Sequence, residues 1–180
     1  MRLCKRQGHT LLSTLYVHAV FALIALAVAG PALRAQVRDP LTAAEANQVR
    51  DTADKLDKRV PLLLSFAQLR LTRFEQVRTA APPAPDRDNE LYDLLRQYHA
   101  ILPELDDAVD DLVAAGPKQY KIPKVLEALI KGENALLASL QHIQTASAPA
   151  DLANYHFELQ DCVDRTTDSL QNAEDARNGK

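Results

Sequence analysis

The chain contains few aromatic residues and very little glycine. Aromatic residues make up 5% of its 180 residues, Trp is absent, and only five residues are Gly. β-Branched and aromatic residues, which suit the pleated surface of a sheet, are few, whereas Ala and Leu are prominent. Because Ala and Leu favour helices, this composition predicts an all-helical protein.

Met, Cys and Gly are too few, or wrongly placed, for the common cofactor sites of helical bundles. The only Met is Met1, and the sequence has no C-x-x-C-H motif, so it offers no haem attachment. No Glu is followed three residues later by His, as a di-iron bundle requires, and the scarcity of Gly excludes a phosphate-binding loop. We therefore expect no cofactor, no catalytic residues and no enzymatic activity.

Residues 1–35 have the pattern of a secretory signal peptide. Three basic residues precede an apolar run over 11–29, and small residues then offer cleavage after Ala35 or, with a better A-x-A fit, after Ala29. The alternative is an uncleaved N-terminal membrane anchor, because the run is nearly long enough to span a bilayer. We expect a periplasmic or extracellular protein without stable membrane insertion after cleavage.

Without residues 1–35 the chain is distinctly acidic and has a single cysteine. Its formal charge changes from −3 to −7, because four basic and no acidic side chains are removed. An acidic chain is a poor partner for nucleic acid or anionic membranes. Cys162 remains as a free thiol without an intramolecular partner, and we interpret it as a small buried hydrophobe, with an intermolecular bridge as the alternative.

Apolar residues recur at alternating steps of four and three along four stretches of residues 36–180, which is typical of bundled helices. Short connectors then predict an antiparallel up-down-up-down four-helix bundle in which the first helix is longest and is kinked at Pro61. Thr42 and Glu45 form a capping box at its start. The predicted helices cover about 42–79, 87–115, 118–146 and 150–176.

The net charges of these helices alternate in sign along the chain. The first and third regions are basic overall, whereas the second and fourth are acidic. This alternation predicts a ring in which each helix packs beside its neighbours in sequence and the fourth closes onto the first.

Two charged residues interrupt the apolar seams. Arg70 lies in the first seam and Glu133 in the third, and connector lengths place both at the level of Tyr98. We predict a polar layer in which Arg70 and Glu133 form a buried ion pair with Tyr98 beside it. The alternatives are that either long side chain extends past the seam to solvent, or that the pair lines a ligand cavity.

Three further features have weak functional interpretations. His142 and His156 fall near the same end of adjacent helices and are candidate metal ligands, although surface histidines are the simpler interpretation. The acidic run over 104–111 could hold a hard cation, but such runs usually face solvent. Kinks at Pro61 and Pro103 could open a pocket between helices.

Together these features predict an exported, non-catalytic helical-bundle protein. It would bind another protein or serve as an accessory component of the cell envelope, and the sequence does not fix its oligomeric state. The alternative is a bundle that binds a small ligand or a metal ion in a cavity between helices, as a carrier or a sensor-like domain.

Overall fold

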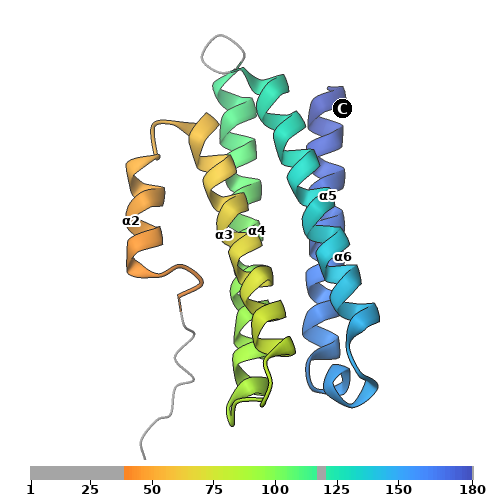
Figure 1. Cartoon of the computed structure of the whole chain (residues 1–180). Coiled ribbons are helices and arrows are strands. Elements are labelled where there is room, and N and C mark those ends of the chain that lie inside the picture. The colour runs from red at the N-terminus through yellow and green to blue at the C-terminus, as the bar shows by residue number, and fades with distance from the viewer. Residues whose placement is uncertain (1–38, 117–120, 180) are drawn as a thin grey trace, which may run out of the picture. The chain divides into compact units, whose positions relative to one another are not determined.

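The computed structural model describes residues 39–116 and 121–179, and within these ranges the chain forms helices and no strand. The predicted signal peptide lies outside the described residues. One short helix precedes four long ones (Figure 1). They are α2 (Ala43–Asp51), α3 (Leu56–Thr79), α4 (Arg87–Ala115), α5 (Ile122–Ala146) and α6 (Pro149–Asn178).

The predicted capping box at the start of the first helix is confirmed. The Thr42 hydroxyl accepts a hydrogen bond from the Glu45 amide at 3.2 Å, and the Glu45 carboxylate accepts one from the Thr42 amide at 2.8 Å. Each side chain thus satisfies a backbone amide that the first helical turn leaves without a partner. This arrangement also fixes the position of the Glu45 carboxylate at the start of α2.

The prediction of one long first helix over 42–79 is wrong. The helix ends at Asp51 and a turn over Thr52–Lys55 separates α2 from α3, so α6 is the longest of the described helices. The Thr52 hydroxyl bonds back to the carbonyl of Val49, a local contact that competes with helix continuation. Because α3 begins at Leu56, Pro61 lies in its second turn and the helix runs on through it.

The four long helices pack in a different order from the predicted ring. α3 packs against α4 and α5, and α6 packs against α4 and α5, whereas α4 and α5 barely touch. Within the described residues the backbones of α3 and α6 do not approach closely, and the two helices meet only through core side chains such as Phe74 and Tyr155, whose ring centroids are 5.2 Å apart. Figure 1 shows α3 overlapping α4, and α5 overlapping α6. The two acidic helices, α4 and α6, are therefore neighbours, so the ring order inferred from alternating charge is wrong.

The buried face of α4 is wider than the predicted seam and is consistent with this order. Leu94, Ile101 and Ala108 are buried at seven-residue intervals along one edge of that seam. A wide apolar face can pack against more than one neighbouring helix. Net helix charge averages over all faces of a helix, so it carries no information about which face is buried.

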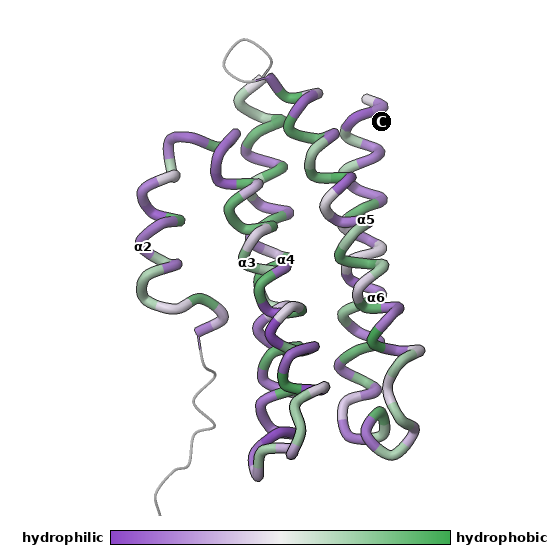
Figure 2. The backbone as a smooth tube through the Cα atoms, viewed as in Figure 1, coloured by the Kyte–Doolittle hydropathy of each residue, from purple (hydrophilic) through white to green (hydrophobic). Residues whose placement is uncertain are grey.

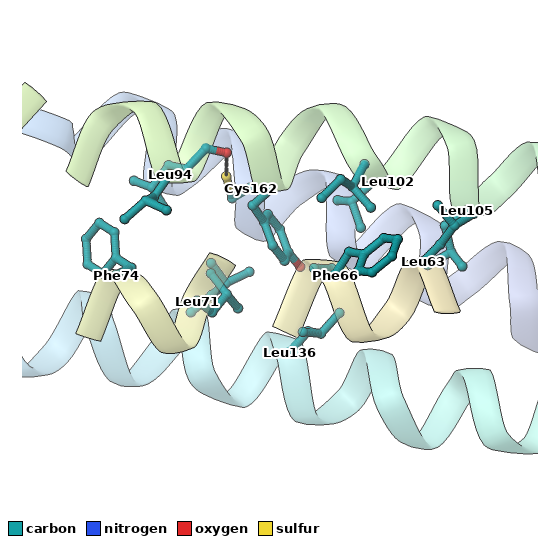
Figure 3. Close-up of a cluster of buried hydrophobic side chains, with 14 of the residues drawn as sticks. Leu63, Phe66, Leu71, Phe74, Leu94, Leu102, Leu105, Leu136 and Cys162 are labelled. Carbon is teal, nitrogen blue, oxygen red and sulfur yellow. Dashed lines mark hydrogen bonds between the residues drawn. The ribbon is translucent and has the colours of Figure 1, made fainter. Parts of the chain in front are cut away.

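Side chains from all four long helices meet in one apolar core. Figure 3 shows α3, with Leu63, Phe66 and Leu71, between α4, which carries Leu102, and α5, which carries Leu136, and the same core includes Cys162 of α6. Along the backbone, hydrophobic and hydrophilic segments alternate within each long helix, as expected of helices with a buried side (Figure 2). The core therefore follows the periodicity of the sequence.

Gly132 allows α5 to approach α3 closely. A Cβ atom at this position would overlap the side chain of Leu64 on α3. The Leu64 side chain thus occupies the space beside Gly132 where α5 packs against α3, two helices that the predicted ring did not place in contact.

Candidate functional site

Arg70 is buried, but its partner is Glu45 of α2 and not Glu133. The Arg70 Nη1 and Nη2 atoms donate hydrogen bonds of 2.7 and 2.6 Å to Glu45 Oε1 and Oε2. Nη2 also donates to the Pro40 carbonyl at 2.7 Å, and Nε donates to Gln97 Oε1 of α4 at 3.0 Å. The guanidinium group thus joins α2, α3 and α4, and the predicted Arg70–Glu133 ion pair is wrong.

The contact with Arg70 changes the ionisation of Glu45. Hydrogen bonds from Arg70 lower the pKa of the Glu45 carboxyl from its ordinary value of 4.5 to about 2, although burial acts in the opposite direction. Both side chains are nearly inaccessible, with relative exposures of 6% and 9%. The bidentate geometry and burial identify this pair as a structural attachment of α2.

Glu133 faces α6 and α4 and belongs to a second polar cluster. Its Oε1 atom lies 2.6 Å from the Ser169 hydroxyl of α6, and the same hydroxyl is within hydrogen-bonding distance of Asp106 Oδ1 on α4. Arg165 of α6 donates to Asp106 Oδ2 at 2.7 Å. We call Glu133, Ser169, Asp106 and Arg165 the carboxyl cluster.

The carboxyl cluster contains two acids whose pKa values are raised. Glu133 is fully buried, and this burial is the main reason that its pKa rises from 4.5 to about 7; the hydrogen bond from Ser169 opposes the shift and the charge of Asp106 adds to it. Burial also raises the pKa of Asp106, with opposition from Ser169 and Arg165. Glu133 Oε2 is buried without a hydrogen-bond partner.

Tyr98 is buried beside the carboxyl cluster but does not contact Arg70. Its hydroxyl lies 2.6 Å from the Thr166 hydroxyl of α6, which in turn donates to the Cys162 carbonyl at 2.7 Å. Burial is the main cause of a raised pKa for the Tyr98 phenol, and the charge of Glu133 contributes to it. The three residues of the predicted polar layer therefore belong to three separate hydrogen-bonded groups.

Cys162 is a free, fully buried thiol, and its Sγ atom lies 3.5 Å from the Leu95 carbonyl (Figure 3). Burial raises the pKa of this thiol well above its usual range. A thiol held neutral in the core is a poor nucleophile, which agrees with a packing role.

A cavity of about 620 Å³ opens between α4 and α6 beside the carboxyl cluster. Asp106, Asp110 and Ser169 supply polar lining groups, while Val109 and Leu129 supply part of an apolar wall. The cavity includes part of the predicted acidic run, which therefore borders a hollow and is not wholly a flat solvated surface. We call this the acidic cavity.

The acidic cavity lies on the most negatively charged side of the described chain. α4 carries eight acidic and two basic residues, and α6 carries seven and two. Two arginines join the helices across their boundary, because Arg87 of α4 pairs with Asp151 of α6 and Arg165 of α6 pairs with Asp106 of α4. These pairs offset part of the repulsion between neighbouring acidic helices.

A second cavity of about 500 Å³ lies between α3 and α5 beside Pro61. Val60, Leu64 and Val125 are among its apolar lining residues, and Lys121 and Lys124 lie at it as well. Pro61, one of the two prolines at which the sequence suggested a pocket between helices, thus borders this cavity.

His142 and His156 are both exposed. The His156 ring packs edge-on against Phe157, with ring centroids 5.3 Å apart. Across residues 39–116 and 121–179, no group of three or more His, Cys, Asp or Glu side chains has an arrangement suited to a metal ion.

In the same ranges, no helix combines the length and apolarity that crossing a bilayer would require.

Comparison of the chain with protein-family models, curated proteins and solved structures found no match.

Several residues of these clusters were not singled out in the sequence. Glu45 was recognised only as a capping residue, and Ser169 was overlooked because it lies one step from the predicted seam of α6. Ser169 is three residues after Thr166, and both have small hydroxyl side chains on a helix packed on two sides. Hydroxyl residues spaced three apart beside an apolar seam were the available signal for this buried polar cluster.

Proposed function

We propose that the protein is an exported, non-catalytic four-helix bundle that binds a positively charged segment of another protein through α4 and α6. Consecutive long helices run antiparallel in this proposal, which the short connectors support. The neighbouring pairs α3–α4, α4–α6, α6–α5 and α5–α3 form the ring.

The observation that carries the proposal is the packing of the two most acidic helices beside each other. Like charges on adjacent helices repel and reduce stability, so an arrangement with acidic helices apart would be more favourable electrostatically. Folding stability does not explain a surface charge distribution that opposes folding, whereas recognition of an oppositely charged partner does. Arg59 and Arg73 of α3 also pair with Glu104 and Glu90 of α4, whereas Asp107, Asp110 and Asp111 of α4 remain exposed.

Lysine and arginine side chains match this face in shape as well as in charge. The acidic cavity places carboxyl groups next to an apolar wall, and the long basic side chains combine a charged end with an aliphatic stem. A basic segment of an envelope protein would therefore satisfy both features.

Titration of the purified chain with a synthetic oligolysine peptide tests the proposal, with an oligoglutamate peptide as the negative probe. Asp110→Asn, at the acidic cavity, should weaken oligolysine binding up to about fivefold, as expected for loss of one exposed charge contact. Glu127→Gln, at an exposed position of α5, makes the same change in net charge and should have little effect on oligolysine binding. Equal effects of the two substitutions, or no binding at about 0.15 M salt, would contradict the proposal.

The second cavity favours one alternative function, the binding of a small apolar molecule with an anionic group. Lys121 and Lys124 would pair with the anion, while Val60 and Val125 would contact the apolar part. Native mass spectrometry of the protein as purified tests this alternative. A retained small molecule whose loss follows Lys124→Gln would favour it over protein binding.

A further inference from the structure

The Ser169 hydroxyl lies between two carboxyl groups that come from different helices. Its Oγ atom is 2.6 Å from Glu133 Oε1 on α5 and within hydrogen-bonding distance of Asp106 Oδ1 on α4. Ser169 is itself buried on α6, so three helices meet at one oxygen atom.

The number of hydrogen atoms at this oxygen limits the ionisation of the two acids. A serine hydroxyl has one hydrogen and can donate it to only one carboxylate, although its oxygen can accept a second hydrogen bond. Two ionised carboxylates could therefore not both be hydrogen-bonded to Ser169. Both short contacts are satisfied when one of the two acids keeps its proton and donates it to Ser169.

The surroundings of the two acids indicate which one keeps the proton. Burial raises the pKa of Asp106 as well, but Asp106 is ion-paired with Arg165 of α6 and borders the acidic cavity, so its charge is better compensated than a charge on Glu133 would be. Glu133 is fully buried and its Oε2 atom has no partner, so a charge there would be almost uncompensated.

The charged and titratable groups on the packed helices agree with this assignment. α4 presents the Asp106 carboxylate and the neutral Tyr98 phenol towards Glu133, and α6 presents Ser169, with Arg165 reaching Asp106. α3 also packs on α5, and within the described residues it brings no titratable side chain into hydrogen-bonding contact with Glu133; its buried Arg70 is engaged with Glu45.

We propose that Glu133 is a neutral acid that donates its proton to Ser169, and that release of this proton is a pH-dependent switch behind the acidic cavity. In the protonated state the hydrogen bonds run from Glu133 to Ser169 and from Ser169 to Asp106. On deprotonation the proton passes to solvent, and Glu133 and Asp106 compete for the single hydroxyl hydrogen.

The pKa of Glu133, raised to about 7 by burial, places this change near neutral pH. An acid whose pKa is higher in the folded state than in the unfolded state stabilises the fold while it is protonated. Stability should therefore decrease as the pH rises from about 4.5 to about 7, and the folding equilibrium constant should fall by up to about 300-fold across that range.

The switch also affects the binding of a cation, and this part rests on the proposed function. A positive charge placed beside Asp106 would favour the ionised form of Glu133 and release its proton. By reciprocity, ionisation of Glu133 would strengthen the binding of oligolysine.

Carbon-13 NMR of the chain labelled at its glutamate side-chain carboxyl carbons tests the protonation directly, without a partner. One resonance should titrate near neutral pH and be absent from the Glu133→Gln variant, whose amide can donate to Ser169 in place of the acid. Glu127→Gln should leave that resonance in place. If every glutamate titrates below about pH 5, the switch is excluded.

Chemical unfolding across the same pH range provides the second measurement. Glu133→Gln should flatten the loss of stability between about pH 5 and 8, and Glu127→Gln should not. An unchanged slope in Glu133→Gln would overturn the proposal. If the raised pKa is observed but oligolysine does not bind, the switch stands and the proposed function fails.

Discussion

Arg70 and Glu45 are separated by 25 positions in the sequence and are joined by two hydrogen bonds of 2.7 and 2.6 Å. Glu45 is the only buried residue of α2, and α2 packs against no long helix other than α3. The helix is attached through this ion pair and the adjoining bond from Arg70 to the Pro40 carbonyl, together with the half-buried Leu41 and Val49, which pack against the core.

The attachment predicts strong coupling between Arg70 and Glu45. Arg70→Met and Glu45→Gln should each reduce the free energy of unfolding by about 2–3 kcal/mol, and the double variant should lose little more than either single variant. Urea unfolding measures these values, and amide exchange in α2 should accelerate in all three variants.

Arg73 and Glu90 form a matched control, because they make a 2.8 Å ion pair while remaining 53% and 39% exposed. Removing either partner should cost less than about 1 kcal/mol. Additive effects at Arg70 and Glu45 would contradict their role as a coupled pair, and coupling between Arg70 and Glu133 would restore the prediction made from the sequence.

Acid should release α2 before the long helices separate. The pKa of Glu45 is lowered to about 2, so its stabilising effect is fully present above about pH 4.5 and is lost as the pH falls through 2. About 3 kcal/mol should disappear over this range in the wild type and not in Glu45→Gln. Together with the opposite effect of Glu133, stability should be greatest near pH 5. A stability maximum above about pH 7 would contradict this prediction.

Cys162 should react slowly with a thiol reagent in native buffer. It is fully buried, and burial raises the pKa of its thiol, so little nucleophilic thiolate is accessible. Labelling should become rapid in denaturant, and Cys162→Ala should cost about 1 kcal/mol or somewhat more. Rapid native labelling or a disulfide-linked dimer would show that the thiol is reached from outside.

The approach of α5 to α3 can be tested at Gly132. Gly132→Ala gains helix propensity of up to about 1 kcal/mol but forces the Leu64 side chain to move. We expect a net loss of stability in the wild-type background and a gain in the Leu64→Ala background. Stabilisation of similar size in both backgrounds would show that Leu64 does not fill this position.

Export should produce a mature chain that begins at Gln36, or at Gly30 if the earlier site is used. N-terminal sequencing of protein recovered from the periplasm or medium measures the cleavage site. Intact Met1 on membrane-bound protein would favour the alternative of an N-terminal anchor.

The sequence predicted the long helices well because their apolar periodicity is regular. The end of α4 at Ala115, before Gly116, was predicted to the residue, and α6 extends only one residue earlier and two later than expected. The kink predicted at Pro61 stays a prediction, whereas the predicted helix is interrupted before it, at Thr52–Lys55. The turn at Thr52–Lys55 contains neither Pro nor Gly, so no strong helix breaker marks it in the sequence.

The polar clusters were harder to predict because connector lengths fix height along a bundle but not rotation about a helix axis. Arg70 donates a hydrogen bond to Gln97, the residue before Tyr98, so the predicted height of Arg70 along α4 was nearly right. Its direction was wrong, since Arg70 faces α2 and α4 while Glu133 faces α6. The ring order had also been inferred from charge, and it placed the wrong helices in contact.

The way α2 is attached also determines how the molecule would respond to mechanical force. A pull on the chain before Pro40 would load the Arg70 contacts with Pro40 and Glu45 before any contact among the four long helices. Once these bonds and the core contacts of Leu41 and Val49 break, the segment from Asp39 to Lys55 can extend to roughly 60 Å at the length of a stretched chain. The segment from Asp39 to Lys55 would thus extend at a lower force than is needed to separate the four long helices.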